Sequence, residues 1–538
     1  MRRDRPSIAS VHLSILTSAY MLFLTNFTFW EKGNIYFSDH KFLLFALAIA
    51  FFALFTATLT SFSVKYLIKP LFIFLIMVSA IASYFVDSFG ILIDRNIIRD
   101  AVATTPNEAR HLITADFGFH VFLYGILPSA LIVWVKVIHR TFLSKVAYNC
   151  ALIFPCLAIA GGLIGINYSA YASTFRERED FVFSINPWAP IIGAFKYARH
   201  ALREKNIKVM PLGEDARKGP LITASEKKVL TVIVVGETAR TQNFSLNYYS
   251  RETNKELASR DVVSFTDISS CGTLTGNSMP CMFSIYTRAE FSVYKANSIE
   301  NLTDVMRHAG IQIAWWDNNT GSKGIADRIS YENLSREKDE RFCHDGECND
   351  GILVERLRRH LDEITDDTVL ILHQIGSHGP AYFLRYPPEF EKFKPACSTV
   401  QFADCTQQEI INAYDNTIVY TDHVLSQIID LLKSRSDKFA TSMLYISDHG
   451  ESLGESGLYL HGLPYFIAPD TQSKVPLIAW FSDDFVKTMR LDLSCLVAKK
   501  EQSYSHDNLF HSILGIMDIK TAVYRQNLDI FASCQIKS

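Results

Sequence analysis

The stretch Lys228-Val-Leu-Thr-Val-Ile-Val-Val-Gly-Glu-Thr238 decides the fold of the larger part of this chain. Its apolar run, Val229 to Val235, has the length of a β-strand and is rich in valine and isoleucine, which is typical of a strand inside a sheet. A glycine and then the carboxylate of Glu237 follow directly. The stretch therefore predicts a strand that carries an acidic side chain at its carboxyl end.

Strand-like runs of the same kind recur along the chain and alternate with segments of helical periodicity. We expect further strands at Gln312–Trp316, Val369–His373, Ser442–Ile446 and Val475–Trp480, and helices at Ile299–Ala309, Ile352–Ile364 and Glu409–Ser434. Alternating strands and helices predict an α/β layer fold with a central, mostly parallel sheet between helices. The active site of such a sheet lies at the carboxyl ends of its strands.

Several of the expected strands end in side chains that bind metal ions. Glu237 follows the first strand, and His378 follows the third. Asp448 and His449 follow the fourth. Oxygen and nitrogen ligands of this kind suit Zn²⁺. A single Glu or His after a strand is more often a helix cap or a solvated loop residue, but the joint placement of these side chains at one edge favours a shared metal site.

A loop of small residues, Ser270 to Cys281, is closed by a cysteine near each end. It is either a turn-rich loop held together for stability or a rigid platform that presents one hydroxyl group. A Thr or Ser hydroxyl is a poor nucleophile at neutral pH unless a base or a metal ion lowers its pKa, and the neighbouring strand ends offer a metal site. Spacing alone does not choose between Thr273, Thr275 and Ser278.

The first third of the chain is strongly apolar. Uncharged stretches run over Val11–Trp30, Phe42–Ser63, Pro70–Val86, Phe117–Val135 and Val146–Ile166. Each has about the length, roughly 20 residues, that a helix needs to cross a bilayer. The alternative for any one of them is a buried core helix. The first run is long and no small-residue cleavage site ends it, so we expect it to stay as an anchor rather than to be removed as a signal peptide.

Basic residues beside these spans predict the orientation of the chain. One side carries Arg2, Arg3, Arg5, Lys65, Lys69, Lys136, Arg140 and Lys145, and the other carries Lys32, Lys41, Arg95, Arg99 and Arg110. The positive-inside rule then places the N-terminus inside. Five crossings put everything after Ile166 on the outer side, which in a bacterium is the periplasm.

Cysteine usage gives an independent indication of the compartment. Two of the ten cysteines, Cys150 and Cys156, lie in the fifth span, and the other eight lie in the exported part. Their even number and close spacing suit disulfides in an oxidising compartment, whereas the alternative, a zinc site, lacks the usual CxxC pair. We expect neighbours to pair, with the last two left to each other: Cys271 with Cys281, Cys343 with Cys348, Cys397 with Cys405 and Cys495 with Cys534.

Length, charge and composition set the organisation of the whole chain. The 538 residues carry a formal net charge of −3, so no basic excess indicates a nucleic-acid partner, and the supply of apolar residues excludes disorder. We expect a monomer with a transmembrane domain at 1–166, a linker at 167–221 and a catalytic domain at 222–538. Trp188, Phe195 and Tyr197 predict either an interfacial helical segment in the linker or a solvated helix on the domain surface.

Seven ordered motifs carry a resemblance to a known family. They are Val-Val-Gly-Glu-Thr-Ala-Arg (234–240), Asn-Phe-Ser-Leu-Asn-Tyr (243–248), Cys-Gly-Thr-Leu-Thr with Pro-Cys-Met-Phe-Ser (271–284), Asp-Asn-Asn-Thr-Gly-Ser-Lys-Gly (317–324), Gly-Ser-His-Gly-Pro (376–380), Ser-Asp-His-Gly-Glu-Ser-Leu-Gly-Glu (447–455) and Leu-His-Gly-Leu-Pro-Tyr (460–465). Together with the apolar spans and exported cysteines, they resemble the lipid A phosphoethanolamine transferase family, which includes the mobile colistin resistance enzymes. The resemblance covers nearly the whole chain and implies an alkaline-phosphatase/sulfatase-like periplasmic domain.

The resemblance also implies roles for individual residues. It selects Thr275 as the nucleophile and implies a zinc ion held by Glu237, Thr275, Asp448 and His449. His378 and His461 match residues that contact the phosphate or an additional zinc, and Lys323 matches a substrate-binding lysine. Thr320 stands where relatives often carry Ser, which keeps a hydroxyl at the substrate site.

The loop before the fourth span departs from the family pattern. Family members place Asn, Thr and Glu four residues apart there to contact the ethanolamine of the donor, and this chain has Asp100, Thr104 and Glu108. One helix would put all three on the same face. However, Pro106 disfavours helix at Thr105, and the Thr-Pro-Asn-Glu stretch fits the capped start of a new helix equally well.

The resemblance implies an enzyme that moves phosphoethanolamine from phosphatidylethanolamine to a lipid A phosphate through a covalent phosphothreonine-type intermediate. The modification reduces the negative charge of the surface and implies resistance to polymyxin and other cationic peptides. A transferase of the same superfamily that acts on a core sugar such as heptose or Kdo, or that transfers phosphoglycerol, is the alternative. A membrane-anchored zinc protein that only binds lipid or senses polymyxin would not need a metal-activated threonine.

Overall fold

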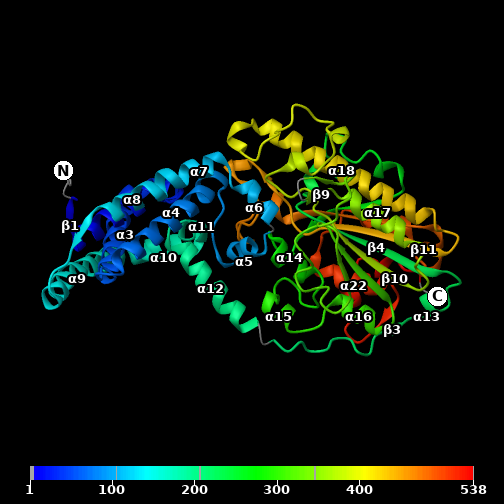
Figure 1. Cartoon of the computed structure of the whole chain (residues 1–538). Helices are drawn as coiled ribbons and strands as arrows, with labels where there is room; N and C mark the ends of the chain where they lie inside the picture. The colour runs from blue at the N-terminus through cyan, green and yellow to red at the C-terminus, as the bar shows by residue number, and fades with distance from the viewer. Residues whose placement is uncertain (1–4, 105, 205–206, 345–346, 537–538) are drawn as a thin grey trace. The chain divides into compact units, whose positions relative to one another are not determined.

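The computed structural model describes residues 5–104, 106–204, 207–344 and 347–536. The chain divides into two compact units (Figure 1). Residues 1–99 and 112–199 form the first, which we call the membrane unit, and residues 100–111 and 200–538 form the second, which we call the catalytic unit. The segment 100–111 therefore belongs to the catalytic unit, although it lies between apolar helices in the sequence.

The membrane unit is helical. Its main helices are α1 (Ser10–Leu24), α2 (Phe27–Tyr36), α3 (Lys41–Ser61), α4 (Ile68–Phe89), α7 (Ala115–Val121), α8 (Leu127–Trp134), α9 (Phe142–Ile166), α10 (Tyr168–Glu177) and α11 (Glu179–Val182), and a π-helix at Phe122–Ile126 joins α7 to α8. In the described part of the chain, four continuous segments are long and apolar enough to cross a membrane, namely 38–61, 68–89, 115–134 and 142–166. The bent pair of α1 and α2 makes a fifth if it is counted as one span.

The first expected span, Val11–Trp30, is not one straight helix. The axes of α1 and α2 differ in direction by 65°. Thr25 Oγ1 and Asn26 Nδ2 both donate to the carbonyl of Met21, at 2.8 Å each, and so take an acceptor that the helix backbone would use. Side chains that compete for backbone groups in this way end or bend helices.

Small side chains let α3 and α9 approach closely. Ala50, Ala53 and Ala57 of α3 form a buried cluster with Cys156 and Ala160 of α9. Small residues at helix contacts are typical of membrane proteins, where dispersion contacts between closely packed backbones replace the hydrophobic driving force. This packing explains why part of these apolar helices is buried within the unit.

The catalytic unit is built on a mixed sheet. In the described residues the sheet has eight strands in the order β15-β5-β14-β11-β4-β10-β6-β7. The strands are β4 (Lys228–Gly236), β5 (Val263–Ser269), β6 (Gln312–Asp317), β7 (Ser330–Asn333), β10 (Thr368–His373), β11 (Phe439–Ser447), β14 (Lys474–Phe481) and β15 (Tyr504–Ser505). β14 runs antiparallel to both of its neighbours, and the other pairs are parallel.

All five expected strands are present, and the expected helices correspond to α16 (Leu302–His308), α17 (Gly351–His360) and α18 (Gln407–Lys433). The α/β prediction is confirmed. Strands β5, β7 and β15 were not expected. Runs such as Ser330–Asn333 are polar and half-exposed, so they lack the apolar pattern of a buried strand.

Helices cover both faces of this sheet, with α17 and α18 on one side and α16 and α22 (Leu509–Ile516) on the other (Figure 1). Val305 and Met306 of α16 and Phe510 of α22 pack in one core with Ile233 of β4. Apolar residues of α14 (Thr275–Met282) pack in the same core. This packing holds in place the helix that begins at Thr275.

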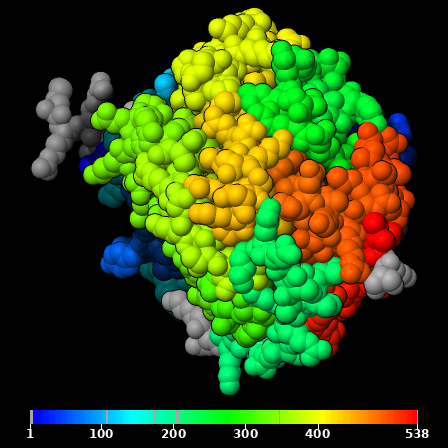
Figure 2. Space-filling view, turned by 90° about the vertical axis from the view of Figure 1, so that its right-hand side faces the viewer, coloured from blue at the N-terminus to red at the C-terminus, as the bar shows by residue number. Residues whose placement is uncertain are grey.

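The stretch expected as a linker, 167–221, contains α10, α11 and α12 (Trp188–Glu204), and its residues from 200 onward belong to the catalytic unit. β3 (Arg217–Lys218) pairs with β16 (Ile519–Lys520), which ties the start of the catalytic unit to its end. Figure 2 shows this juxtaposition at the surface, where blue-green and red segments lie side by side. The linker boundaries themselves stay a prediction.

Disulfides close loops within the catalytic unit. Among the described residues the bonds join Cys271 to Cys281, Cys343 to Cys348, Cys397 to Cys405 and Cys495 to Cys534. These are the pairs expected from the sequence. Cys150 and Cys156 of α9 carry free thiols.

Loop length predicts how much each disulfide stabilises the fold. The Cys495–Cys534 bond spans 39 residues and the Cys343–Cys348 bond spans 5. The chain-entropy relation gives about 4 kcal/mol for the longer loop and about 2 kcal/mol for the shorter one. We expect the double variant Cys495→Ser/Cys534→Ser to melt at a lower temperature in detergent than Cys343→Ser/Cys348→Ser does. The reverse order would show that loop entropy does not govern these bonds.

Candidate active site

The carboxyl ends of β4 and β11 hold a group of charged side chains together. Gly236 pairs with Ser447 at the end of these two parallel strands, and the N–H of Asp448 donates to the carbonyl of Gly236 at 3.0 Å. Glu237 follows β4 directly, and Asp448 and His449 follow β11. The strand register therefore brings the three side chains to one point.

The next residue, Thr238, adopts a left-handed backbone conformation with φ 59°, which is rare for a β-branched residue. Its N–H donates to Asp448 Oδ1 at 3.1 Å and its hydroxyl donates to Glu237 Oε1 at 2.6 Å. Gly376 lies against the same turn, where a Cβ would come within 2.7 Å of the Glu237 carbonyl oxygen. The turn is thus held in a strained conformation of the kind that clusters at functional sites.

Glu237, Asp448 and His449 have the geometry of a metal-binding group. One ligand atom of each lies within 4.8 Å of the others. His449 Nε2 is 3.4 Å from Glu237 Oε1 and 3.3 Å from Asp448 Oδ2, and all three side chains are completely buried. Two carboxylates and an imidazole form a set of donors that zinc accepts.

Two details show that these donor atoms suit a cation. Asp448 Oδ2 is buried and has no hydrogen-bond donor among the residues that the structure describes, although buried carboxylate oxygens are normally satisfied. His449 Nδ1 lies 3.0 Å from the carbonyl oxygen of Gly450, so it carries the proton and donates. Nε2 is then a bare lone pair directed at the carboxylates, which is the tautomer that binds a metal ion.

The electrostatics of the group also favour a cation. Burial and then the neighbouring Glu237 raise the pKa of Asp448. Burial lowers the pKa of His449, but the charges of Asp448 and Glu237 outweigh burial and raise it overall. Burial raises the pKa of Glu237, but the nearby imidazoles, with His449 first, outweigh it and lower the pKa overall. The electrostatic potential at these three side chains therefore stabilises positive charge.

Thr275 is the first residue of α14 and presents its hydroxyl to this group. Oγ1 lies 3.1 Å from each carboxylate oxygen of Glu237 and 3.3 Å from His449 Nε2. The competing hydroxyls are engaged elsewhere: Thr273 donates to the carbonyl of Leu463 at 2.6 Å, and Ser278 donates to the carbonyl of Asp448 at 2.5 Å. Of the three hydroxyls in this loop, that of Thr275 is the one within hydrogen-bond reach of the carboxylates.

His378 and His461 lie beside the group. The ring of His461 has its centroid 4.3 Å from that of His449 and 5.8 Å from that of His378. Buried Glu451 accepts from His461 Nδ1 at 2.7 Å and from the hydroxyl of Tyr382 at 2.5 Å. These bonds leave Nε2 of His461 as the ring nitrogen that can meet a substrate.

A buried arginine supports His378. Arg385 Nε donates to the carbonyl oxygen of His378 at 2.9 Å, and its Nη1 forms a 2.7 Å ion pair with Glu347. Burial raises the pKa of Glu347, but Arg385 outweighs burial and lowers it overall. The carboxylate therefore stays charged and holds the guanidinium against the backbone of His378.

The loop after β6 contributes an amide and an ammonium group. Asn319 Nδ2 donates to Glu237 Oε2 at 2.9 Å and to the carbonyl of Gln374 at 2.8 Å. Lys323 Nζ donates to the carbonyl of Thr320 at 3.0 Å and to its hydroxyl at 2.6 Å. Lys323 lines a cavity of about 330 Å³. Ser284, which follows the end of α14, lines the same cavity.

The structure does not place Asp100, Thr104 and Glu108 on one helix. Asp100 lies in α5 (Arg95–Ala103), and a new helix, α6 (Pro106–Leu112), begins at Pro106. The proline cannot continue the preceding helix, so of the two alternatives for this loop the structure has the start of a new helix at Pro106. Contacts of Asp100, Thr104 and Glu108 with ethanolamine stay a prediction. Thr104 Oγ1 donates to the carbonyl of Asp100 at 2.9 Å. The side chain of Glu108 lies outside the described part of the structure.

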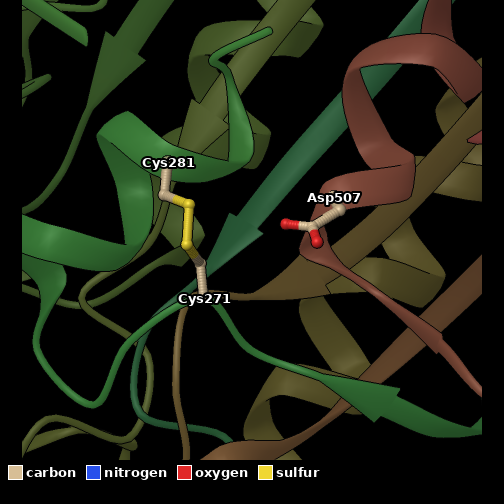
Figure 3. Close-up of side chains that lie close together, drawn as sticks. All are labelled: Cys271, Cys281 and Asp507. Carbon is tan, nitrogen blue, oxygen red and sulfur yellow. A yellow bond between two sulfur atoms is a disulfide. The ribbon is translucent and has the colours of Figure 1, made fainter. Parts of the chain in front are cut away.

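A second group of potential ligands lies at the closed loop. Cys271, Cys281 and Asp507 approach one another (Figure 3). Their sulfur atoms form a disulfide and thus offer no thiolate, which is the form of cysteine that binds metal ions. The group closes the platform below Thr275 rather than forming a metal site.

Sequence reasoning missed several polar residues around the site. Asn319 and Glu451 lie inside the quoted motifs but gave no separate signal, because an amide or carboxylate that supports a ligand has no spacing rule of its own. His506 lies outside these motifs, and its contact with the platform arises only when β15 joins the sheet. Long-range contacts of this kind leave no local pattern.

Comparison with known proteins covers both units. Residues 230–519 match the family model described as Sulfatase, and residues 51–202 match the model described as Phosphoethanolamine transferase EptA/EptB. The chain is 38% identical to phosphoethanolamine transferase EptA of Escherichia coli (strain K12), over 99% of this chain and 98% of that protein. It is 36% identical to phosphatidylethanolamine transferase Mcr-1 of Escherichia coli, over 88% and 90% of the two chains.

A solved structure extends the similarity to the complete fold. The integral membrane lipooligosaccharide phosphoethanolamine transferase A of Neisseria meningitidis superposes with a TM-score of 0.95 at 33% identity, over 99% of this chain and 100% of that chain. With the apolar helices, this match makes the chain an inner-membrane protein with a periplasmic catalytic domain. The carboxylate–imidazole group, the adjoining threonine and the similarity along the full chain lead to one conclusion: the chain belongs to the phosphoethanolamine transferase family.

Proposed function

We propose that this enzyme transfers phosphoethanolamine from phosphatidylethanolamine to a phosphate group of lipid A, with Thr275 as the nucleophile. The observation that carries the proposal is the position of Thr275 Oγ1, 3.1 Å from both oxygens of Glu237 and 3.3 Å from His449 Nε2. A hydroxyl held against a carboxylate and an imidazole can lose its proton as it attacks. Two lipid substrates explain why the catalytic unit is joined to a membrane unit.

In the first step, Thr275 Oγ1 attacks the phosphorus atom of the donor phosphodiester. The Thr275 O–P bond forms and the bond from phosphorus to the diacylglycerol oxygen breaks. The proton lost by Thr275 is balanced by a proton that the departing diacylglycerol oxygen gains, so neutral diacylglycerol leaves and phosphoethanolamine remains on Thr275. His461 Nε2 is suited to move this proton, because Glu451 fixes Nδ1 of the same ring.

In the second step, a phosphate oxygen of lipid A attacks the same phosphorus atom. The new P–O–P bond forms, the bond to Thr275 Oγ1 breaks, and the proton released by the acceptor phosphate returns to Thr275. His378 and Lys323 are placed to neutralise negative charge on the phosphoryl oxygens. Thr320 orients Lys323 through the contact between its hydroxyl and Nζ. Asp100, Thr104 and Glu108 contact the ethanolamine of the donor in this proposal.

The zinc ion of this proposal is held by Glu237, Asp448, His449 and Thr275. Its fit rests on the unpaired Asp448 Oδ2 and on the bare Nε2 of His449. When bound, zinc supplies Lewis-acid charge that lowers the pKa of a ligand hydroxyl and stabilises negative charge on oxygen.

The proposed product explains the expected phenotype. Each transfer adds a negatively charged phosphodiester together with a positively charged ammonium group, and it converts an ionisable oxygen of the acceptor phosphate into a bridging oxygen. The net negative charge of lipid A therefore falls. Electrostatic attraction for polymyxin and other cationic peptides falls with that charge.

Zinc content tests the ligand set. His449→Ala removes the imidazole nitrogen that faces the two carboxylates, so we expect less than one zinc per chain in the purified protein and a loss of transfer of at least about a hundredfold. The matched control is His360→Ala, because His360 is a partly exposed histidine whose Nδ1 pairs with Glu363 on the surface. A metal-free wild-type protein with full activity would refute the zinc proposal.

Mass mapping after incubation with phosphatidylethanolamine alone tests the nucleophile. We expect phosphoethanolamine on the peptide that contains Thr275, and Thr275→Ala should abolish both the adduct and transfer. Thr275→Ser should be damaged less, because it keeps the oxygen and loses only the methyl group that restricts the rotamer.

Thr273→Ala is the control for the platform, since Thr273 donates to a backbone carbonyl rather than facing the carboxylates. This variant should still form the adduct on Thr275. Substantial transfer by Thr275→Ala, or an adduct on Thr273, would show that another hydroxyl is the nucleophile.

An acceptor assay tests the second substrate. With labelled phosphatidylethanolamine and purified lipid A, we expect label on a lipid A phosphate. Label on a heptose or Kdo of the core instead, with lipid A unmodified, would assign the enzyme to the core-sugar alternative.

A further inference from the structure

His506 joins two segments of the site. One is the loop closed by Cys271 and Cys281, which we call the nucleophile loop because it contains Thr275, and the other is the end of β11, directly before Asp448 and His449. Its Nδ1 lies 3.1 Å from the backbone nitrogen of Cys271, and its Nε2 lies 3.0 Å from the carbonyl oxygen of Ser447. Cys271 begins the disulfide-closed loop that leads to Thr275, and Ser447 is the last residue of β11. One imidazole ring therefore spans the gap between the two halves of the site.

These contacts determine the tautomer of His506. The backbone N–H of Cys271 is a donor, so Nδ1 accepts, and the Ser447 carbonyl is an acceptor, so Nε2–H donates. Burial, and then the nearby His449, lower the pKa of His506 to about 3. The ring is neutral at physiological pH, and both of its nitrogens are engaged with backbone groups.

A second bond between the two halves reinforces this bridge. Ser278, one turn into α14 from Thr275, donates its hydroxyl to the carbonyl of Asp448 at 2.5 Å, and its oxygen lies 3.2 Å from His506 Nδ1. The start of α14 is therefore fastened to the end of β11 at adjacent points. Glu237 directly follows β4, which pairs with β11. The position of Thr275 relative to the carboxylates therefore depends on these bonds between α14 and the end of β11.

We infer that His506 is a positioning residue for the transfer reaction: through Cys271 and Ser447 it holds Thr275 at attacking distance from the metal-binding group. The inference rests on the proposed role of Thr275. His506 does not carry the transferred proton, since both ring nitrogens are occupied by the backbone. A displacement of about 1 Å at a reacting atom can cost about a hundredfold in rate, so loss of this bridge should act on the chemical step.

Isosteric variants separate the two bonds of the ring. In His506→Asn the amide oxygen can replace Nδ1 as the acceptor for Cys271, whereas the donor to Ser447 is lost. In His506→Gln the amide nitrogen can replace Nε2 as the donor to Ser447, whereas the acceptor for Cys271 is lost. Both variants keep a polar side chain in the buried site and thus avoid leaving both backbone groups unpaired.

His511 provides a matched control. Like His506, it is almost completely buried, with 1% of its surface exposed. Its Nδ1 also accepts a hydrogen bond from a backbone N–H, that of Arg525, at 3.1 Å. Burial, and then Arg525, lower the pKa of His511 to about 4. His511 thus shares burial, neutral charge and hydrogen bonding with His506, but its partner is not part of the nucleophile loop. His511→Asn reports what the loss of a buried histidine does to the fold alone.

The experiment measures the rate of phosphoethanolamine loading on Thr275 in the full chain, with KM for phosphatidylethanolamine, zinc content and the thermal midpoint measured in parallel. We expect both His506 variants to load about tenfold to a hundredfold more slowly, with KM within about threefold of wild type and zinc retained. His511→Asn should lower the thermal midpoint to a similar extent and keep the wild-type loading rate. The pH dependence of loading should keep its form in all variants, because His506 does not titrate in that range.

Three results would overturn the inference while leaving Thr275 as the nucleophile: wild-type loading rates in both His506 variants, an equal loss of rate in His511→Asn, or the disappearance of one limb of the pH profile in the His506 variants. The last would make His506 a proton carrier. Absence of any adduct on Thr275 in the wild-type protein would instead refute the proposed function itself.

Discussion

Parallel pairing of β4 with β11 and β10 is the constraint on which the site depends. The register that sets Gly236 opposite Ser447 also sets Val235 opposite His373, so these strands end at one edge of the sheet. Glu237, Asp448 and His449 come from segments about 200 residues apart in the chain, yet they need no long or flexible side chain to meet. A shift of one residue in either pair would turn the side chains at the strand ends toward opposite faces.

The same register buries two carboxylates where water cannot stabilise them. Burying charge is costly unless the charge is paired or coordinates a metal ion, and one oxygen of Asp448 has no donor within the described part of the chain. His449, Asn319 and Thr238 supply part of the compensation. Burial of these carboxylates costs stability at this point and leaves a site whose negative charge favours a cation. Disulfides and the interlocked ends of the catalytic unit hold the surrounding fold in place.

Much of this arrangement could be predicted from local sequence. Apolar runs such as Val229–Val235 predicted the central strands, because strands that are buried on both faces are rich in consecutive valine and isoleucine. The residues that follow those runs predicted the candidate metal-binding group. Other features depend on contacts that no local pattern records. Asn26 bends the first apolar segment through bonds to Met21 and Asn186, and His506 reaches the nucleophile loop only through tertiary packing. The choice of Thr275 among the hydroxyls came from family resemblance, and the structure adds a geometric reason for it.

Anomalous scattering at the zinc edge is the most direct test of the central claim, that β4, β11 and α14 build one metal-binding nucleophile site. Crystals of the zinc-loaded protein should show a peak enclosed by Glu237, Asp448, His449 and Thr275, in contact with Oγ1 of the threonine. A peak at another position in an active preparation, or no peak between these side chains, would contradict the account.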